Sequence, residues 1–429
     1  MGAEHSLILY LIMAKLVFSI WLSNACSPGG STFPTLLTKF SSPEEIYNAE
    51  LSDISKIIGY RNSDRAALDD KDLERATRIY EFCKKHNVGI VSYFDNGYPE
   101  LLRKIASPPV LLYYRGTFPD FDKKFTVACV GTRSISEYGR KSAFRISYDL
   151  ATAGATIVSG MAMGIDSICA AGAISAGAST VAVLGSGIDV CYPPQHLKLA
   201  REIVKCGCII TEYAPGTKPN KYNFPKRNRI ISGLSRATIV FEGEERSGAK
   251  YTARYAKEQE RPVYALPGNV GAKNSELTNM LLKQGAKPCT TAEDVINDFS
   301  LEFPHILNPF KLPERFTVDM MGILHQLEVV AICPNDDVFI PPRPKRIYER
   351  KLEDEPDIEI EAVEITPPEN FDKSALEIYK KIPSNGDISI ELLVDEKYNL
   401  REVMKQLLKL EMGGFVVLLP SEKVARKTK

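Results

Sequence analysis

The stretch FTVACVGTRS, residues 125–134, decides the fold: a continuous apolar run ends at a glycine that is followed by an arginine. Similar runs, rich in Val, Ile, Ala and Thr, occur at residues 155–158, 179–184, 208–211, 237–241 and 262–265. Helical patterns over residues 138–153, 166–176, 194–206 and 249–259 separate most of them. Continuous apolar strands that alternate with helices predict a parallel sheet covered by helices on both faces. We therefore expect an α/β domain.

Glycine and hydroxyl residues collect where these strands end. They follow the strands at residues 131–134, 159–166, 185–189 and 242–250. Ligands of a parallel sheet bind beyond the carboxyl ends of its strands, and helix N-termini in such loops offer N–H groups to anions. The pattern predicts a phosphate-binding rim. Neither the P-loop signature nor the dinucleotide fingerprint is present, since Val190 stands where the third glycine belongs.

A dense basic cluster lies in the stretch FPKRNRIISG, residues 224–233. Three cations and an amide occupy the four positions from Lys226 to Arg229, and Arg and Asn suit planar binding of phosphate or base edges. The alternative is a basic helix N-terminus at an ordinary surface. Several cations at one edge of a sheet would suit the successive phosphates of a nucleic-acid strand. Binding of single-stranded nucleic acid also requires aromatic side chains that stack on bases. Phe224, Tyr213 and Tyr222 are candidates, although Phe224 suits a hydrophobic core equally well.

The composition is that of a soluble protein, with 44% hydrophobic and 25% charged residues and a net charge of zero. Eight acids and two bases between Arg350 and Asn370 mask a positive remainder. Nine scattered cysteines without a C-x-x-C pair indicate a reducing cytoplasm and no zinc site. Residues 7–22 are apolar, but Lys15 interrupts them and no Lys or Arg precedes them. This favours a buried first helix over a signal peptide or a membrane span.

A hydrolytic site is poorly supported. Ser159, Asp166 and His196 are available, but the G-x-S-x-G elbow is missing, and His196 is expected to cap a helix or to lie at the surface. Glu244 and Glu245 are expected to be exposed beside Arg246. We expect no catalytic residue, no metal and no cofactor.

Four regions are expected along the chain. Residues 1–62 form short helices, residues 63–300 the α/β domain with 63–120 as its N-terminal extension, and residues 301–370 a linker that is acidic and partly disordered. Residues 371–424 are expected to hold helices at 374–382, 388–394 and 400–412 and a two-stranded wing that turns at Gly413-Gly414. This is the order of a winged helix, whose third helix carries Arg401, Lys405 and Lys409.

The ordered motifs resemble those of the bacterial DNA-processing protein A family (DprA, also called Smf). The matching stretches are VGTR (130–133), VSGMAMGID (158–166), AVLGSGID (182–189), EYAPG (212–216), FPKRNRII (224–231), SGA (247–249) and LPG (266–268). YPELL (98–102) and PPVL (108–111) fit upstream. The resemblance runs through nearly the whole chain and is densest from residue 127 to 286.

This resemblance implies a non-enzymatic, cytoplasmic protein that binds single-stranded DNA through a Rossmann-like domain. It implies protection of incoming strands and loading of RecA recombinase in natural transformation, a homodimer, an N-terminal domain of the sterile-alpha-motif type and a C-terminal winged helix. Carried over by position, the DNA pocket comprises Arg133, Ser159, Gly160, Lys226, Arg227, Asn228, Arg229, Ser247 and Gly248. Lys250 is added because it lies at the same edge of the sheet.

The sequence departs from the family pattern at a few positions. Met163 stands in place of a cation, Ala170 and Ala171 replace a His-Arg pair, and Leu277 replaces a glycine. These changes remove positive charge from one flank of the pocket and leave residues 226–229 intact. Two alternatives remain: a nucleotide-processing enzyme of the LOG type, whose P-G-G signature is matched only in part at Pro28-Gly29-Gly30, and a duplex-DNA regulator that acts through the winged helix.

Overall fold

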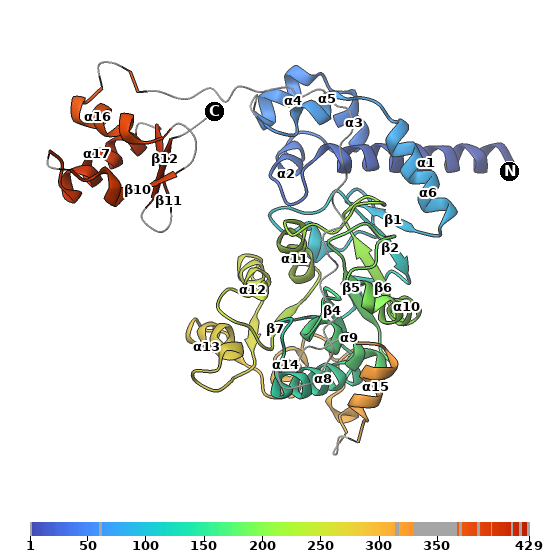
Figure 1. Ribbon diagram of the computed structural model, residues 1–429. Coiled ribbons are helices and arrows are strands. Elements are labelled where there is room, and N and C mark those ends of the chain that lie inside the picture. Colours follow the sequence, from blue (N-terminus) through green and yellow to red (C-terminus); the bar gives the residue numbers. More distant parts are fainter. Residues whose placement is uncertain are drawn as a thin grey trace. The chain divides into compact units, whose positions relative to one another are not determined.

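The computed structural model of the chain shows two compact units, residues 1–339 and 340–429 (Figure 1). It describes residues 2–59, 62–313, 317–329, 367–368, 371–383, 387–395, 397–412, 415–419 and 423–426. Most of the acidic stretch at residues 350–370 lies outside the described residues.

A nine-stranded sheet with the order β1-β2-β6-β5-β4-β3-β7-β8-β9 organises the first unit. The strands are β1 (Gly89–Ser92), β2 (Leu111–Gly116), β3 (Thr126–Val130), β4 (Thr156–Ser159), β5 (Thr180–Val183), β6 (Cys208–Thr211), β7 (Ala237–Val240), β8 (Val263–Ala265) and β9 (Lys287–Pro288). Strands β3 to β9 are parallel, as predicted. The sheet as a whole is mixed, because β2 pairs antiparallel with both β1 and β6.

The two faces of the sheet carry separate hydrophobic cores, because successive side chains of a strand point to opposite sides. On β3, Val127 and Cys129 belong to one core and Ala128 and Val130 to the other. Helices α8 (Glu137–Thr152), α9 (Ile165–Ser175), α10 (Leu197–Cys206) and α14 (Glu293–Phe299) cover the first face. Helices α7 (Glu100–Arg103), α11 (Asn223–Gly233), α12 (Ala249–Glu258) and α13 (Glu276–Lys283) cover the second (Figure 1).

The path of the chain through the sheet creates one switch point. From β3 the chain moves outward through β4 and β5 to β6, and it then returns to place β7 on the other side of β3. At such a reversal the helices on either side diverge, which leaves a crevice at the carboxyl ends of the strands. The loops that follow β3 and β7 therefore border the same crevice.

Short helices precede the sheet, as the sequence predicts: α1 (Gly2–Ala25), α2 (Thr32–Leu36), α3 (Pro43–Asn48), α4 (Leu51–Ile58), α5 (Arg65–Asp69) and α6 (Glu74–Lys85). Ile20, Trp21 and Leu22 of α1 are buried, which confirms a packed first helix there. No helix among the described residues has the length and apolarity needed to cross a membrane. The likeness of this region to a sterile alpha motif stays a prediction.

Residues just after the α/β domain correct the expected start of the linker. Phe303 and Leu307 are buried, and so are Leu324 and Leu327, around helix α15 (Met320–Gln326). All four belong to the core on the α8–α9 face of the sheet. Over its described residues, the segment from 301 to 329 is therefore part of the first unit. Met320, Ile323, Leu324 and Leu327 recur at the helical spacing i, i+3, i+4, i+7. The sequence therefore carries the signal, which the Pro-rich and acidic composition of residues 304–370 obscures.

The second unit contains α16 (Lys373–Lys381), β10 (Asp387–Ser389), a 3₁₀ turn (Ile390–Leu393), α17 (Leu400–Met412), β11 (Val416–Leu419) and β12 (Lys423–Arg426). The strands form an antiparallel sheet of order β10-β12-β11. The expected second helix is only a 3₁₀ turn that follows a strand. The hairpin pairs β11 with β12, so the chain reverses between Leu419 and Lys423. Gly413-Gly414, where the turn was expected, lies outside the described residues. The winged-helix assignment stays a prediction.

We expect Leu307→Ala to lower the free energy of unfolding by about 2–5 kcal/mol, because Leu307 is 3% exposed in the shared core. Leu301→Ala is the matched control: Leu301 is 94% exposed, and its loss should change stability by less than about 0.5 kcal/mol. Chemical denaturation of the full chain measures both. Equal effects of the two substitutions would mean that residues 301–329 do not pack in the core and belong to the linker.

Candidate nucleic-acid interface

A cleft of about 630 Å³ opens at the switch point, at the carboxyl ends of β3 and β7. Its walls come from the loop after β3, from helix α11 and from the loop that leads into α12. The lining includes Thr132, Arg133, Ser134, Asp166, Tyr192, Lys221, Phe224, Arg227, Asn228, Glu244, Arg246, Ser247, Gly248 and Thr252. A volume of this size is typical of a ligand site.

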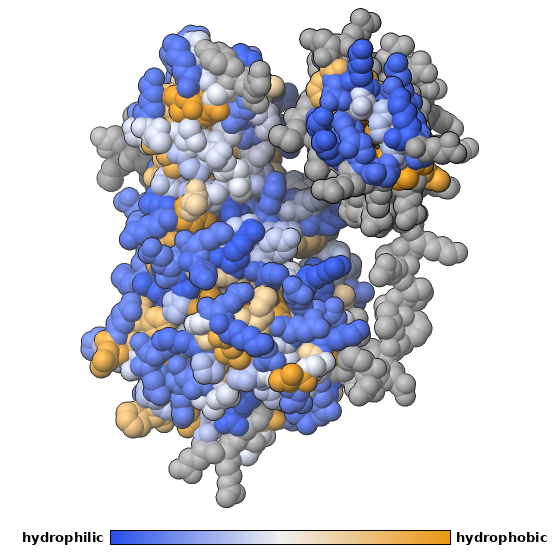
Figure 2. Space-filling model, turned by 90° about the vertical axis from the view of Figure 1, so that its left-hand side faces the viewer, coloured by the Kyte–Doolittle hydropathy of each residue, from blue (hydrophilic) through white to orange (hydrophobic). Residues whose placement is uncertain are grey.

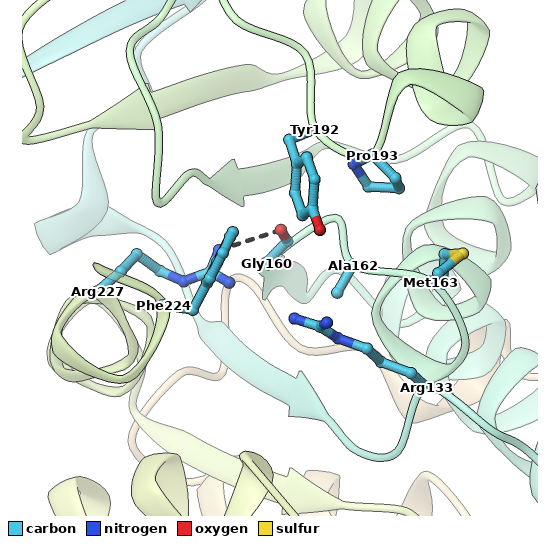
Figure 3. A pocket seen from close by; sticks show the side chains of 8 residues that line it. All are labelled: Arg133, Gly160, Ala162, Met163, Tyr192, Pro193, Phe224 and Arg227. Carbon is cyan, nitrogen blue, oxygen red and sulfur yellow. Dashed lines mark hydrogen bonds between the residues drawn. The ribbon is translucent and has the colours of Figure 1, made fainter. Parts of the chain in front are cut away.

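At its inner end the cleft narrows to a recess of about 20 Å³ (Figure 3). Arg133 extends into this recess from the loop after β3, and Phe224 enters from α11. The ring of Phe224 lies 5.3 Å from that of Tyr192 and 5.7 Å from the guanidinium carbon of Arg133. Two aromatic rings and an exposed cation thus meet at one point.

Arg227 forms the floor of the recess and is only 4% exposed. Its guanidinium donates hydrogen bonds to the carbonyl of Gly160 at 3.0 Å (dashed in Figure 3) and to the carbonyl of Val183. Burial lowers the pKa of Arg227 to about 10, although the nearby Asp166 carboxylate opposes this shift. The side chain is therefore still a cation at neutral pH. It holds α11 to the ends of β4 and β5.

Arg229 is buried, and its guanidinium donates hydrogen bonds to the Glu212 carboxylate and to backbone carbonyl groups. It makes a bidentate ion pair with Glu212, with two N–O distances of 2.6 Å, and its Nε donates to the carbonyl of Ser107 at 2.8 Å. Arg229 and Glu212 are 4% and 7% exposed. The three cations of residues 226–229 are therefore not equivalent. Helix α11 turns Arg227 and Arg229 inward, where Arg227 donates to backbone carbonyls and Arg229 pairs with Glu212, and it leaves Lys226 exposed.

Two buried hydrogen bonds hold the loop between β4 and α9, which forms the back of the recess. The Gly160 N–H donates to Asp166 at 3.1 Å, and the ring of His196 donates from Nδ1 to the carbonyl of Met161 at 3.0 Å. Met161 has a positive φ of 56°, a conformation that needs such support. A Cβ on Gly160 would lie 2.5 Å from Arg227, so only glycine admits the guanidinium there.

Burial changes the expected properties of two of these side chains. His196 has no exposed surface, which corrects the expectation of a surface histidine. It does stand at the N-cap position of α10, but its side chain makes no capping hydrogen bond. Burial also lowers its pKa below the ordinary value of 6.5. Burial raises the pKa of Asp166, and the charge of Arg227 opposes that shift. Both residues act as supports of the loop.

The remaining predicted site residues fall into three groups. The hydroxyl of Ser159 is buried and donates to the carbonyl of Cys129 at 2.6 Å, so its role is structural. Asn228, Ser247 and Gly248 line the cleft, and the Asn228 amide donates to the carbonyl of Gly248 at 3.3 Å. Lys226 and Lys250 are exposed, but neither lines the cleft.

The exposed charges of the cleft are mainly positive. Arg133, Lys221 and Arg246 are exposed cations in its lining, against the exposed acid Glu244. Among the residues that the structure describes, none of these three cations forms an ion pair. The N-terminus of α12 adds backbone N–H groups and partial positive charge at the same wall. The cleft is therefore suited to bind several anionic groups.

Sequence reasoning missed Tyr192, Lys221 and Arg246. Each lies in a loop, where no periodic pattern indicates which way a side chain points. Their position after the ends of β5, β6 and β7 is the signal that was available. Of the predicted stacking residues, Tyr213 is 6% exposed, and its hydroxyl donates a hydrogen bond to the carbonyl of Asn223, so its ring is not available to stack on a base. Tyr222 is 65% exposed and is available.

Of Met163, Ala170 and Ala171, which depart from the family pattern, one reaches the cleft and two do not. Met163 lines the inner recess, so a cation is missing at a position that reaches the site. Ala170 and Ala171 are buried in α9 and do not line the cleft. Within the described ranges, no group of three or more His, Cys, Asp or Glu side chains is placed to hold a metal ion.

Comparison with known proteins agrees with this geometry. The family model of DNA recombination-mediator protein A matches residues 89–300, which run from β1 to the end of α14. DNA processing protein DprA of Streptococcus pneumoniae is 38% identical over 254 residues, which cover 58% of this chain and 86% of that protein. The chain belongs to this family.

Other relatives extend the match. DNA processing protein DprA of Bacillus subtilis is 34% identical over 54% of this chain and 78% of its own length. Protein Smf of Synechocystis is 38% identical over 54% of this chain, and the match spans 57% of that relative's length. The solved structure of DprA from Streptococcus pneumoniae superposes with a TM-score of 0.57 and 33% identity, over 65% of this chain and 97% of that one.

We expect Arg229→Met to lower the free energy of unfolding by about 3–5 kcal/mol, because it leaves the Glu212 carboxylate buried without a partner. The double variant Glu212→Met/Arg229→Met should be more stable than Arg229→Met alone. Denaturant titration of the variants measures the difference. If the double variant lost as much unfolding free energy as the two single substitutions added together, the two side chains would not stabilise each other.

The burial of His196 predicts a pH effect. Its folded-state pKa is lowered, so below about pH 6.5 the unfolded chain takes up a proton that the native ring does not. Stability should fall as the pH drops through this region, with a slope of up to about 1.4 kcal/mol per pH unit. In His196→Gln this part of the slope should vanish. An unchanged slope would mean that another group causes it.

Proposed function

We propose that this protein binds single-stranded DNA in the cleft between β3, α11 and α12, without catalysing a reaction. The observation that carries the proposal is the meeting of exposed Arg133 with the rings of Phe224 and Tyr192 in a cleft lined by further cations. Sequence-tolerant binding of single strands requires a cationic groove together with aromatic faces. The cleft provides both.

The proposed contacts divide into two kinds. Arg133, Lys221, Arg246 and the N-terminus of α12 contact the phosphates, and Phe224 and Tyr192 contact base faces. Arg227 contributes positive potential from the floor, although carbonyl groups occupy its guanidinium. Arg229 contributes only to the scaffold. The sequence predicted that residues 226–229 contact the DNA. We propose instead that residues of the surrounding loops make most of these contacts.

The wider role rests on membership of the family. A recombination mediator handles single strands that another protein pairs, and we propose that this chain protects incoming DNA and loads RecA recombinase onto it during natural transformation. We place it in the cytoplasm, acting as a homodimer. The named relatives are DNA-processing proteins, which is consistent with this role.

The alternatives lack a matching site. Pro28-Gly29-Gly30 lies in the turn before α2, where Gly29 packs against Lys226 and Arg229, and does not border the cleft. In the second unit, Lys405 and Lys409 of α17 pair with Glu402 and Asp372 at 3.9 and 2.7 Å. The two acids offset part of the positive charge of α17, although such exposed pairs contribute little and are readily exchanged.

We expect Arg133→Ala to weaken binding of oligothymidylate and to reduce the salt dependence of binding. Each phosphate contact on a single strand contributes a log–log slope of about −0.7, so the slope should become less negative by about that amount. Arg133 is exposed, so the fold should persist. Fluorescence anisotropy at several salt concentrations measures the change.

Lys205→Ala is the control, because Lys205 is an exposed cation on α10, on the other face of the sheet. It removes the same charge without touching the cleft, and its salt slope should equal that of the wild type. Equal slopes for wild type and Arg133→Ala would contradict the proposed site. The combined Arg227→Ala/Arg229→Ala variant is not informative, because it removes structural contacts as well.

A further inference from the structure

Helix α12 starts at the rim of the cleft and leads away from it. Ser247, Gly248, Ala249 and Thr252 line the cleft at the start of the helix. Lys250, the next exposed residue, does not line it. The side of the α/β domain that carries α12 and α13 in Figure 1 faces the viewer in Figure 2, where hydrophilic residues cover most of the surface.

The solvent face of α12 carries cations and an aromatic ring at helical spacing. Lys250, Tyr251, Arg254 and Lys257 are exposed, whereas Thr252, Ala253 and Ala256 are buried against the sheet. The guanidinium carbon of Arg254 lies 5.4 Å from the ring centre of Tyr251 and 5.1 Å from that of Tyr255. Tyr251 is 42% exposed. The packing of Arg254 holds this ring in place at the surface.

The charge on this face is positive. Glu258 is the single acid in α12. It pairs with Arg254 at 3.4 Å, but both side chains are more than half exposed, and such a pair is readily exchanged for another anion. Within the described residues, Lys250 and Lys257 form no ion pair. From Lys250 to Lys257 the cations extend over about 10 Å along the helix axis.

We infer that the solvent face of α12 is a second segment of the single-strand binding track, which takes the nucleotides that leave the cleft at the α12 N-terminus. Lys250, Arg254 and Lys257 contact phosphates, and Tyr251 stacks on a base. This inference rests on the proposed function of the cleft. Two observations favour nucleic acid as the ligand: the face is continuous with the cleft, and its charge and exposed ring match those of a single strand.

The test compares a short oligothymidylate of about four nucleotides, the lower end of the site sizes of single-strand-binding grooves, with one of about twenty. Tyr251→Ala/Arg254→Ala should leave the affinity for the short strand within twofold and weaken the long strand about tenfold, because a stacked base and a phosphate contact are lost. The salt slope should become less negative by about 0.7 for the long strand only. Tyr251→Phe keeps the ring and should keep long-strand binding.

Arg78→Ala is the matched control. Arg78 on α6 is similarly exposed and pairs with Glu74 four residues away, as Arg254 pairs with Glu258. It should leave both affinities unchanged. Unchanged long-strand binding in the α12 variant, or equal weakening of both lengths, overturns the inference. If Arg133→Ala still weakens both lengths, the cleft proposal survives that result. If Arg133→Ala weakens neither, the cleft proposal itself fails.

Discussion

The buried guanidinium of Arg227 is the contact on which the arrangement of the cleft depends. A cation that is 4% exposed is costly unless hydrogen bonds and nearby negative charge offset its burial. Here Nη1 donates to the carbonyls of Gly160 and Val183 and Asp166 lies nearby, whereas Nε has no partner within the described residues. This contact ties α11 to the ends of two strands. Since Phe224 and Asn228 lie on the same helix, their positions in the cleft follow from it.

The cleft is thereby formed before any ligand arrives. Gly160 admits Arg227, His196 fixes the carbonyl of Met161, and Asp166 holds the N–H of Gly160. The side chains that remain exposed, Arg133 among them, project from loops whose backbones are held at their base. A preorganised groove of this kind loses little conformational entropy on binding, which suits the proposed sequence-independent binding of single strands.

The sequence predicted the fold well where periodicity carries the signal. The strand at residues 208–211 and the helix at 400–412 have their predicted bounds. The sequence could not show that Arg227 and Arg229 are interior, because their partners Gly160 and Glu212 lie far away along the chain. A dense cationic motif has the same appearance whether its charges face solvent or carbonyl groups. The packed residues around Leu307 and Leu324 do follow a helical spacing, but the Pro-rich and acidic composition of the segment outweighed it and favoured a linker.

The most direct test of the account is photochemical cross-linking of oligothymidylate that carries a photoreactive thymine, followed by identification of the linked peptides. The account predicts cross-links at Tyr192 and in residues 222–228, on the rim and floor of one cleft. Cross-links confined to residues 371–426 would contradict it, since single strands would then be bound by the second unit.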